Sequence, residues 1–192
     1  MRLRRKFYRL TQNSVMQNNV VQSYFELFGL KPAFNIDLAI LENHYRKIQS
    51  ESHPDRFVNA TSAEKLQSMQ LATLANEAYQ TLKEPASRAK YLLELQGIEA
   101  ISETNTAMPA DFLMQQMEWR ETLEDAKAAK DIAAVDNLLN QIKQEAKSLN
   151  TELVSLIDTK QDYGSATDAT RKLIFIDKVC ADINKVIEQI EN

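Results

Sequence analysis

Apolar residues recur along most of this chain at intervals of three and four, which is the spacing of one face of an α-helix. The clearest cases are two long segments near the C-terminus, with apolar positions at Ile132, Val135, Leu139, Ile142, Ala146, Leu149, Leu153 and Leu156, and then at Leu173, Ile176, Cys180, Ile183, Ile187 and Ile190. Two such seams, joined by a turn at residues 163–167, predict an antiparallel helical bundle. Residues 109–129, which begin with a proline, are expected to form the third helix.

The N-terminal half shows shorter helical segments separated by turn residues. Residues 23–30 end near Gly29, as a brief helix with a glycine stop would. Asp37 is placed to cap a second helix, which must stop before Pro54. The apolar face expected for this second helix is Leu38, Leu41, Tyr45 and Ile48.

Thr61 and Glu64 have the spacing of a capping box, which predicts the start of a long helix. Its expected packing residues are Leu66, Met69, Leu74, Ala78 and Leu82. Pro85 is expected to end or kink this helix, and a further short helix then runs to Gly97, a residue typical of helix ends.

Composition agrees with a wholly helical fold. The chain has only three glycines and four prolines in 192 residues, so turns are few, while strong helix formers are abundant. Residues 98–107 have no strong apolar period and predict a linker. We therefore expect an all-α protein with a basic extension at residues 1–22, an N-terminal domain at 23–97 and a helical bundle at 108–192.

Several function classes are disfavoured by the same composition. No stretch approaches the roughly 18 uninterrupted apolar residues of a membrane span, so a soluble protein without membrane contact is expected. A single cysteine, Cys180, excludes an internal disulfide, and the lack of a Cys or His cluster argues against a metal site held by this chain alone. We predict no cofactor and no metal.

The net charge of -4 conceals an asymmetry. Residues 1–22 carry five basic side chains and no acid, so the rest of the chain carries -9. A body this acidic is a poor match for nucleic acid, because affinity for phosphates comes mainly from clustered Lys and Arg. The basic leader is compatible with a transit peptide, but a disordered tail or a start codon assigned too early is preferred.

The tripeptide His53-Pro54-Asp55 stands between two predicted helices. A proline there ends the first helix, so the imidazole and the carboxylate are presented on a loop. One hypothesis is an enzyme in which His53 is a general base oriented by Asp55. Residues on either side of a proline do not ordinarily face each other, however, and no nucleophile or metal motif accompanies them. The other histidine, His44, is expected to be an ordinary, partly exposed helix residue.

The tripeptide follows a helix that carries Arg46 and Lys47 and precedes the sequence NEAYQTL at residues 76–82. This arrangement resembles a J domain. The resemblance implies that the protein stimulates ATP hydrolysis by a DnaK-type chaperone, and that the chaperone contacts His53, Pro54, Asp55, Arg46, Lys47 and Arg56. Ser50-Glu51-Ser52 replaces the basic and aromatic residues that J domains commonly carry just before the tripeptide, so part of the usual positive surface is missing.

Further matches extend from Pro85 and Gly97 to the sequences FLMQQMEWRETLED at residues 112–125 and RKLIFIDK at 171–178. Together they resemble the HscB family, the J-domain co-chaperones of bacterial iron-sulfur cluster assembly. The resemblance runs from about residue 23 to the C-terminus. Only the basic leader falls outside it.

Residues 112–125 also show a second apolar surface. At about 100° per residue, Phe112, Trp119, Leu123 and Ala126 share one side of the helix, which is the expected core face. Three other apolar residues lie away from it among carboxylates. Such a surface predicts a docking site, unless the first domain covers it. Resemblance to HscB assigns an IscU-type scaffold protein to this surface, at the positions Leu113, Met114, Met117, Glu118, Glu121 and Asp125.

Phe175 is a parallel case in the last helix. It lies off the apolar seam by roughly a quarter turn or more, and Ile174 lies farther off. Periodicity alone makes both residues candidates for a partner contact or for packing against the other domain. The resemblance selects Phe175 as a scaffold-binding residue.

We therefore predict a two-domain co-chaperone that is not itself an enzyme. It is expected to bind an IscU-type scaffold, to deliver it to a DnaK-type chaperone (HscA) and to stimulate that ATPase. A bacterial cytoplasmic location is expected, or the mitochondrial matrix if residues 1–22 are a transit peptide. The alternatives are an enzyme that uses the His53-Asp55 pair, and a helical adaptor or J-like protein that serves another client of a DnaK-type chaperone.

Overall fold

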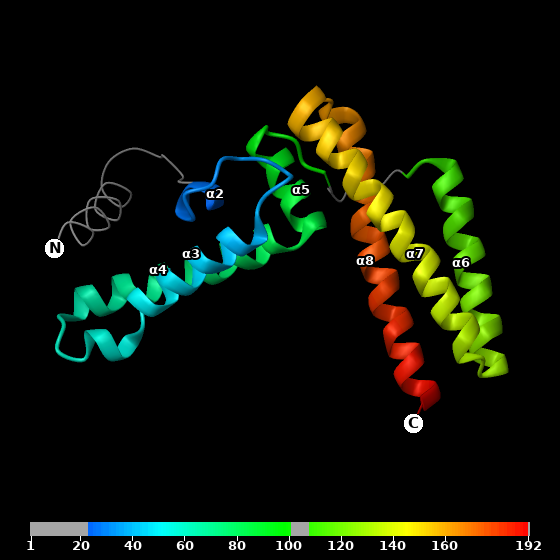
Figure 1. The fold of residues 1–192 in the computed structure, drawn as a ribbon, viewed down its shortest axis with the longest axis horizontal. Helices are drawn as coiled ribbons and strands as arrows, with labels where there is room; N and C mark the ends of the chain where they lie inside the picture. The colour runs from blue at the N-terminus through cyan, green and yellow to red at the C-terminus, as the bar shows by residue number, and fades with distance from the viewer. Residues whose placement is uncertain (1–22, 101–107, 192) are drawn as a thin grey trace. The chain divides into compact units, whose positions relative to one another are not determined.

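The computed structural model describes residues 23–100 and 108–191, and the predictions made for residues 1–22 and 101–107 lie outside these ranges (Figure 1). Within them all regular structure is helical, which confirms the all-α prediction. The elements are α2 (Tyr24–Leu27), α3 (Leu38–Glu51), η1 (Pro54–Phe57), α4 (Ser62–Lys83), α5 (Pro85–Leu95), α6 (Ala110–Ala129), α7 (Ile132–Leu153), η2 (Val154–Lys160) and α8 (Tyr163–Glu191). None of these helices is long and apolar enough to span a membrane.

The chain divides into two compact units. The first unit contains α2, α3, η1 and α4, and the second contains α5 to α8 together with the short segment Ala33–Ile36. The domain limits of 23–97 and 108–192 stay a prediction. By its contacts, α5 belongs to the second unit.

The first unit is a helical hairpin of α3 and α4, which lie side by side in Figure 1. Both predicted helix starts are confirmed. The Asp37 carboxylate accepts hydrogen bonds from the amides of Ala39 and Ile40. The hydroxyl of Thr61 accepts from the amide of Glu64, whose carboxylate in turn accepts from the amide of Thr61, as a capping box requires.

The predicted packing faces of this hairpin are only partly correct. Leu41 and Ile48 of α3 and Ala78 and Leu82 of α4 are buried. Tyr45 is half-buried, and the remaining large residues are exposed, by 49% for Leu38, 57% for Leu66, 62% for Met69 and 40% for Leu74. Spacings of three and four fit two different faces of α4, and the buried one consists mostly of small side chains, Ser68, Ala75 and Ala78.

Polar contacts hold α4 in this rotation. The side-chain oxygen of Asn76 accepts hydrogen bonds from the Tyr45 hydroxyl at 2.8 Å and from the Gln49 amide at 2.7 Å. The rings of Tyr45 and Tyr79 stack with centroids 4.1 Å apart. On the other side of α4, the Tyr24 hydroxyl donates to the Glu77 carboxylate. The sequence NEAYQTL therefore contributes contacts of α4 with both α3 and α2.

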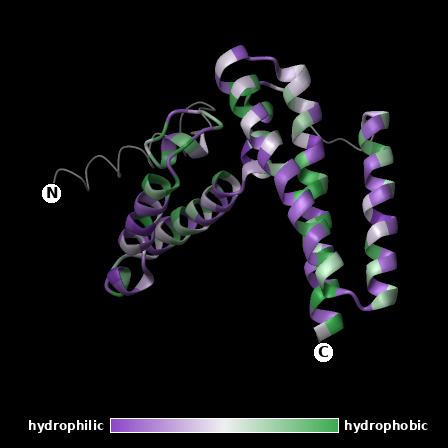
Figure 2. Cartoon of the chain, turned by 45° about the vertical axis from the view of Figure 1, so that its right-hand side comes forward, coloured by the Kyte–Doolittle hydropathy of each residue, from purple (hydrophilic) through white to green (hydrophobic). Residues whose placement is uncertain are grey.

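In the second unit α7 packs against α6 and α8, as the predicted bundle requires. Both predicted seams are at least half-buried, and Figure 2 shows apolar and polar residues alternating around the bundle helices as in amphipathic helices. The fully buried large residues of the bundle are Phe112, Val135, Ile142, Leu153, Leu173, Ile176 and Ile183. The expected core face of α6 is confirmed for Phe112, Trp119 and Ala126, and Leu123 is half-buried.

The turn predicted at residues 163–167 is wrong, because these residues form the first turns of α8. The chain leaves α7 through the π-helical segment η2 and reverses at Gln161, which adopts a left-handed conformation with φ 54°. Asp162 then accepts hydrogen bonds from the amide and the hydroxyl of Ser165. These bonds lower the pKa of the Asp162 carboxyl and cap the new helix.

The Asp158 carboxylate binds segment Ala33–Ile36 to the bundle through two hydrogen bonds. Asp158 in η2 accepts hydrogen bonds from the backbone amides of Phe34 at 2.7 Å and Asn35 at 2.8 Å. The buried guanidinium of Arg88 lies 5.2 Å from the centre of the Phe34 ring. Burial lowers the pKa of Arg88, while the nearby charge of Asp158 raises it. The cation, the ring and the carboxylate therefore form one cluster within the second unit.

We predict that Asp158→Asn destabilises the second unit. The amide loses the charge that strengthens both hydrogen bonds and can accept with only one oxygen, so the expected loss is about 1–2 kcal/mol in the free energy of unfolding. Urea unfolding measures this loss, with the exposed Asp136→Asn as the control. Equal midpoints for the two variants would contradict the role given to Asp158.

Candidate functional site

The His53-Pro54-Asp55 tripeptide occupies the bend between α3 and α4, as predicted. Helix α3 ends at Glu51, and His53 has extended backbone angles (φ -64°, ψ 134°), as a residue before proline prefers. Pro54 then begins the tight turn η1. The fixed backbone angle of the proline suits this first helical position and makes the bend rigid.

The functional side chains of the tripeptide point into solvent. The side chains of His53 and Asp55 are 59% and 86% exposed. The amide of Asp55 donates to Nδ1 of His53 at 3.3 Å, and a carboxylate oxygen of Asp55 lies 3.5 Å from the same nitrogen. The expectation that the two residues do not face each other is therefore wrong, because the tight turn folds Asp55 back over the ring.

The His53-Asp55 pair lacks the burial that is common at a catalytic site. A general base in an enzyme commonly owes its tuned pKa to burial and to nearby charges, and these two side chains are exposed. In the part of the chain that the structure describes, no three side chains of His, Cys, Asp or Glu are grouped to hold a metal ion. The geometry favours a surface that another protein reads.

The predicted basic residues lie on both sides of the tripeptide in the sequence. Arg46 and Lys47 are exposed on α3, and the Arg46 guanidinium forms an ion pair with Glu42 one turn earlier. Arg56 donates to the backbone carbonyl of Ser50 at 3.3 Å. Arg56 thus ties η1 to the end of α3 while its side chain stays on the surface.

Ser68 of α4, which the sequence analysis did not single out, supports the bend through a hydrogen bond to Ser52. Ser52, directly before His53, is buried, and its carbonyl oxygen accepts a hydrogen bond of 2.6 Å from the hydroxyl of Ser68 on α4. The Ser52 hydroxyl donates back to the carbonyl of Ile48. The serine that replaces the more usual large residue is thus part of the support of the tripeptide. Only the small size of Ser68 on an otherwise apolar face signals this contact in the sequence.

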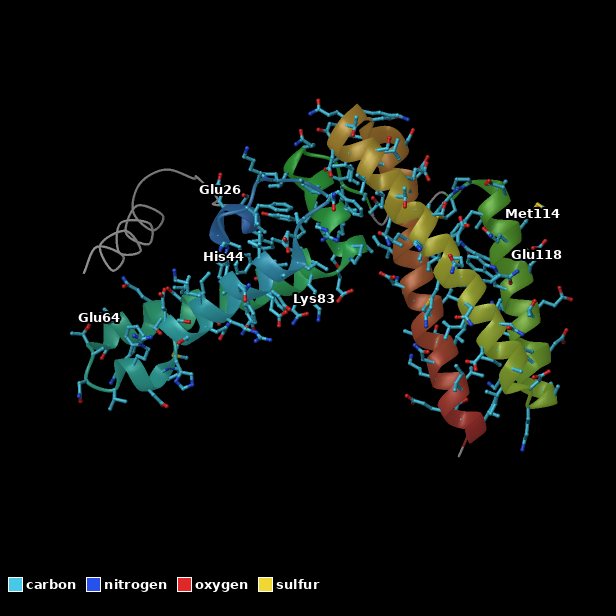
Figure 3. The ribbon with its side chains drawn as sticks, viewed as in Figure 1. Glu26, His44, Glu64, Lys83, Met114 and Glu118 are labelled. Atoms are coloured by element: carbon cyan, nitrogen blue, oxygen red, sulfur yellow. The ribbon has the colours of Figure 1, made fainter. Side chains whose placement is uncertain are left out.

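A second candidate surface lies on α6, on the side turned away from the bundle core. Leu113, Met114 and Met117 are exposed by 46%, 65% and 72%, as predicted. Figure 3 shows Met114 on the side of α6 that points away from α7 and α8. The carboxylates of this surface, Glu118, Glu121 and Asp125, belong to exposed residues. We call these six residues the α6 docking face.

Phe175 of α8 is half-buried. Its ring meets the ring of Phe112 edge to face, with centroids 5.8 Å apart, and Phe112 meets Trp119 in the same way at 5.9 Å. The Lys172 ammonium lies 5.5 Å from the centre of the Phe112 ring. Phe175 therefore connects α8 to the core of α6, and its exposed part remains available to a partner.

These features define a class of protein. A helical hairpin that holds an exposed His-Pro-Asp bend, joined in one chain to a helical bundle with an exposed apolar and acidic face, is the architecture of a J-domain co-chaperone with its own cargo-binding unit. Comparisons with known proteins identify the family.

Residues 108–184 match the family model described as the HSCB C-terminal oligomerisation domain. The chain is 48% identical over 170 residues to the co-chaperone protein HscB homolog of Paraburkholderia phymatum, covering 88% of this chain and 97% of that one. The solved chaperone HscB from Vibrio cholerae is 37% identical, with a TM-score of 0.77 over 88% of this chain and 99% of that chain. The human co-chaperone protein HscB is 30% identical, with a TM-score of 0.80 over 87% and 83%.

The chain belongs to the HscB family of co-chaperones, the family that serves iron-sulfur cluster assembly. Members of this family act as co-chaperones rather than as enzymes.

We predict that Ser68→Ala loosens the bend. The substitution leaves the buried carbonyl of Ser52 without its partner, which costs about 1–3 kcal/mol in the free energy of unfolding. Urea unfolding checks the cost, and Thr73→Ala is the control, because its exposed hydroxyl bonds only to the carbonyl of Met69 in its own helix. If Ser68→Ala is as stable as Thr73→Ala, the hydrogen bond does not support the tripeptide.

Proposed function

We propose that this protein holds an IscU-type iron-sulfur scaffold on the α6 docking face and brings it to a DnaK-type chaperone (HscA), whose ATPase the His53-Pro54-Asp55 bend stimulates. The single observation that carries the proposal is the exposed, rigid bend, in which His53 and Asp55 point away from the protein. The protein makes and breaks no covalent bond itself. ATP, magnesium and the catalytic groups belong to the chaperone, and the setting is the bacterial cytoplasm.

The stimulation requires a difference in affinity between two states of the chaperone. A ligand that binds both states equally shifts no equilibrium, so the bend must bind the hydrolysis-competent state more tightly than the resting state. His53 and Asp55 supply hydrogen-bonding groups for that preference, and Pro54 keeps them in place. Nδ1 of His53 lies against the Asp55 amide, which leaves Nε2 of the ring for a hydrogen bond with a partner.

Basic residues add long-range attraction to this contact. Arg46, Lys47 and Arg56 are exposed, and cations on the rim of an interface mainly raise the rate of association and set orientation. Two of them already have partners within the chain, Glu42 and the Ser50 carbonyl. Each is therefore expected to contribute modestly, on the scale of about 0–1 kcal/mol for exposed pairs.

The α6 docking face suits a partner protein with apolar side chains inside a basic rim. Two methionines adapt their shape to such a partner, and three exposed apolar residues in water are unfavourable unless a partner covers them at some stage. The surrounding carboxylates select a partner that carries positive charge. A scaffold held here and a chaperone held at the bend meet at a high effective concentration.

We expect His53→Gln to abolish the stimulation of the chaperone ATPase. Coupling free energies between sites are typically about 1–3 kcal/mol, a factor of about 5 to 150, so a loss of this size is readily measured in steady-state ATPase assays. The matched control is His44→Gln, the other histidine of the chain, which lies on α3 and contacts the carbonyl of Phe28. Full stimulation by His53→Gln, or turnover of a small substrate by the isolated protein, would exclude the proposed role of the bend.

We expect Met114→Ala/Met117→Ala to weaken scaffold binding by tenfold or more. Burial of a methionine side chain contributes about 1.5–3 kcal/mol, and tenfold in affinity corresponds to about 1.4 kcal/mol. Calorimetric titration with an IscU-type scaffold measures the change. Leu95→Ala is the control, since Leu95 is 41% exposed on α5, away from the docking face in sequence. An unchanged affinity for the double variant would remove the scaffold from this face.

A further inference from the structure

A groove between α6 and α7 has no place in the function described so far. Its volume is about 500 Å³. The residues that line it are Gln115, Glu118, Trp119 and Thr122 of α6 and Leu138, Gln141, Gln144 and Glu145 of α7. Both helices belong to the second unit, so the groove lies within one compact body.

The lining has a distinct chemistry. Trp119 and Leu138 are buried and form an apolar floor, while Glu118, Thr122, Gln141 and Gln144 are exposed and form the rim. Side-chain amides both donate and accept hydrogen bonds, which suits the backbone of an extended segment. Carboxylates accept only, and the lining contains two of them, Glu118 and Glu145, but no lysine or arginine. The groove therefore favours a polar segment that carries a cation.

The groove is continuous with the α6 docking face. Glu118 belongs to both, and at about 100° per residue Thr122 and Gln115 lie about 40° and 60° from Glu118 on the side toward the core. The nearby cations of α6 are remote from this edge, because Arg120 and Lys127 lie about 160° and 180° around the helix from Glu118. A partner seated on the docking face thus reaches the groove across an acidic edge.

We propose that the groove receives an extended, basic segment of the same scaffold protein, so that the scaffold contacts both the α6 docking face and α7. This inference rests on the proposed function of the α6 docking face. Phe175 packs edge to face against Phe112, and Phe112 packs in the same way against Trp119, which forms part of the floor of the groove.

Charge substitutions at Gln144 test the groove. Gln144→Lys places a cation on the rim and is expected to weaken scaffold binding about tenfold or more, which corresponds to about 1.4 kcal/mol. Gln144→Glu is expected to bind at least as tightly as the wild type, with a steeper dependence on salt. Asn140→Lys is the matched control, because it adds the same charge one turn earlier on α7 at an exposed residue outside the lining. Calorimetric titrations at two salt concentrations give all of these affinities.

The outcomes separate this inference from the function on which it rests. Equal affinities for Gln144→Lys and Asn140→Lys, with binding still lost in Met114→Ala/Met117→Ala, would overturn the groove and leave the docking face intact. If the methionine variant also binds normally, the docking face itself is wrong. If Gln144→Lys binds the scaffold more weakly, while Asn140→Lys and Gln144→Glu bind it with normal affinity, the result supports a basic occupant. Far-ultraviolet circular dichroism of each variant shows that the helices are retained.

Discussion

The hydrogen bond from the Ser68 hydroxyl to the buried carbonyl of Ser52 fixes the point at which the chain leaves α3. A buried carbonyl without a partner is costly, so the chain cannot shift this residue without losing stability. His53, the next residue, is therefore held in an extended conformation, and Pro54 begins a turn that leaves both functional side chains in solvent. The exposed surface of the tripeptide thus depends on a buried contact behind it.

The two units are held together by different kinds of contact. In the first unit, polar contacts around Asn76 and Ser68 determine how the hairpin helices pair, so the bend is precise although the buried face of α4 is made mostly of small side chains. In the second unit, long apolar seams on α7 and α8 bury a large core, and this core supports a helix whose outer side is apolar without being covered by the bundle. One side of α6 packs into the core of the bundle, and the opposite side exposes apolar residues to solvent.

The α6 docking face and its surroundings are both acidic. Apart from residues 1–22, the chain carries a charge of -9, and the carboxylates of α6 continue into the groove between α6 and α7. Charge of one sign over a continuous surface accelerates association with an oppositely charged partner and excludes partners of the same sign. The basic residues near the bend have the opposite sign, so the surface around the bend and the α6 docking face differ in charge.

The sequence by itself determined what depends on residues within about four positions of one another. The helical repeats, the caps at Asp37 and Thr61, the bend at Pro54 and the exposed methionines of α6 all follow from such local patterns, and the structure has each of them. Tertiary structure alone decided which face of α4 is buried, where the chain reverses before α8, and that a groove opens between α6 and α7. The physical reason is that these features depend on contacts between distant residues, such as Ser52 with Ser68 and Phe34 with Asp158, and a repeat of three and four does not specify which side of a helix meets its neighbour.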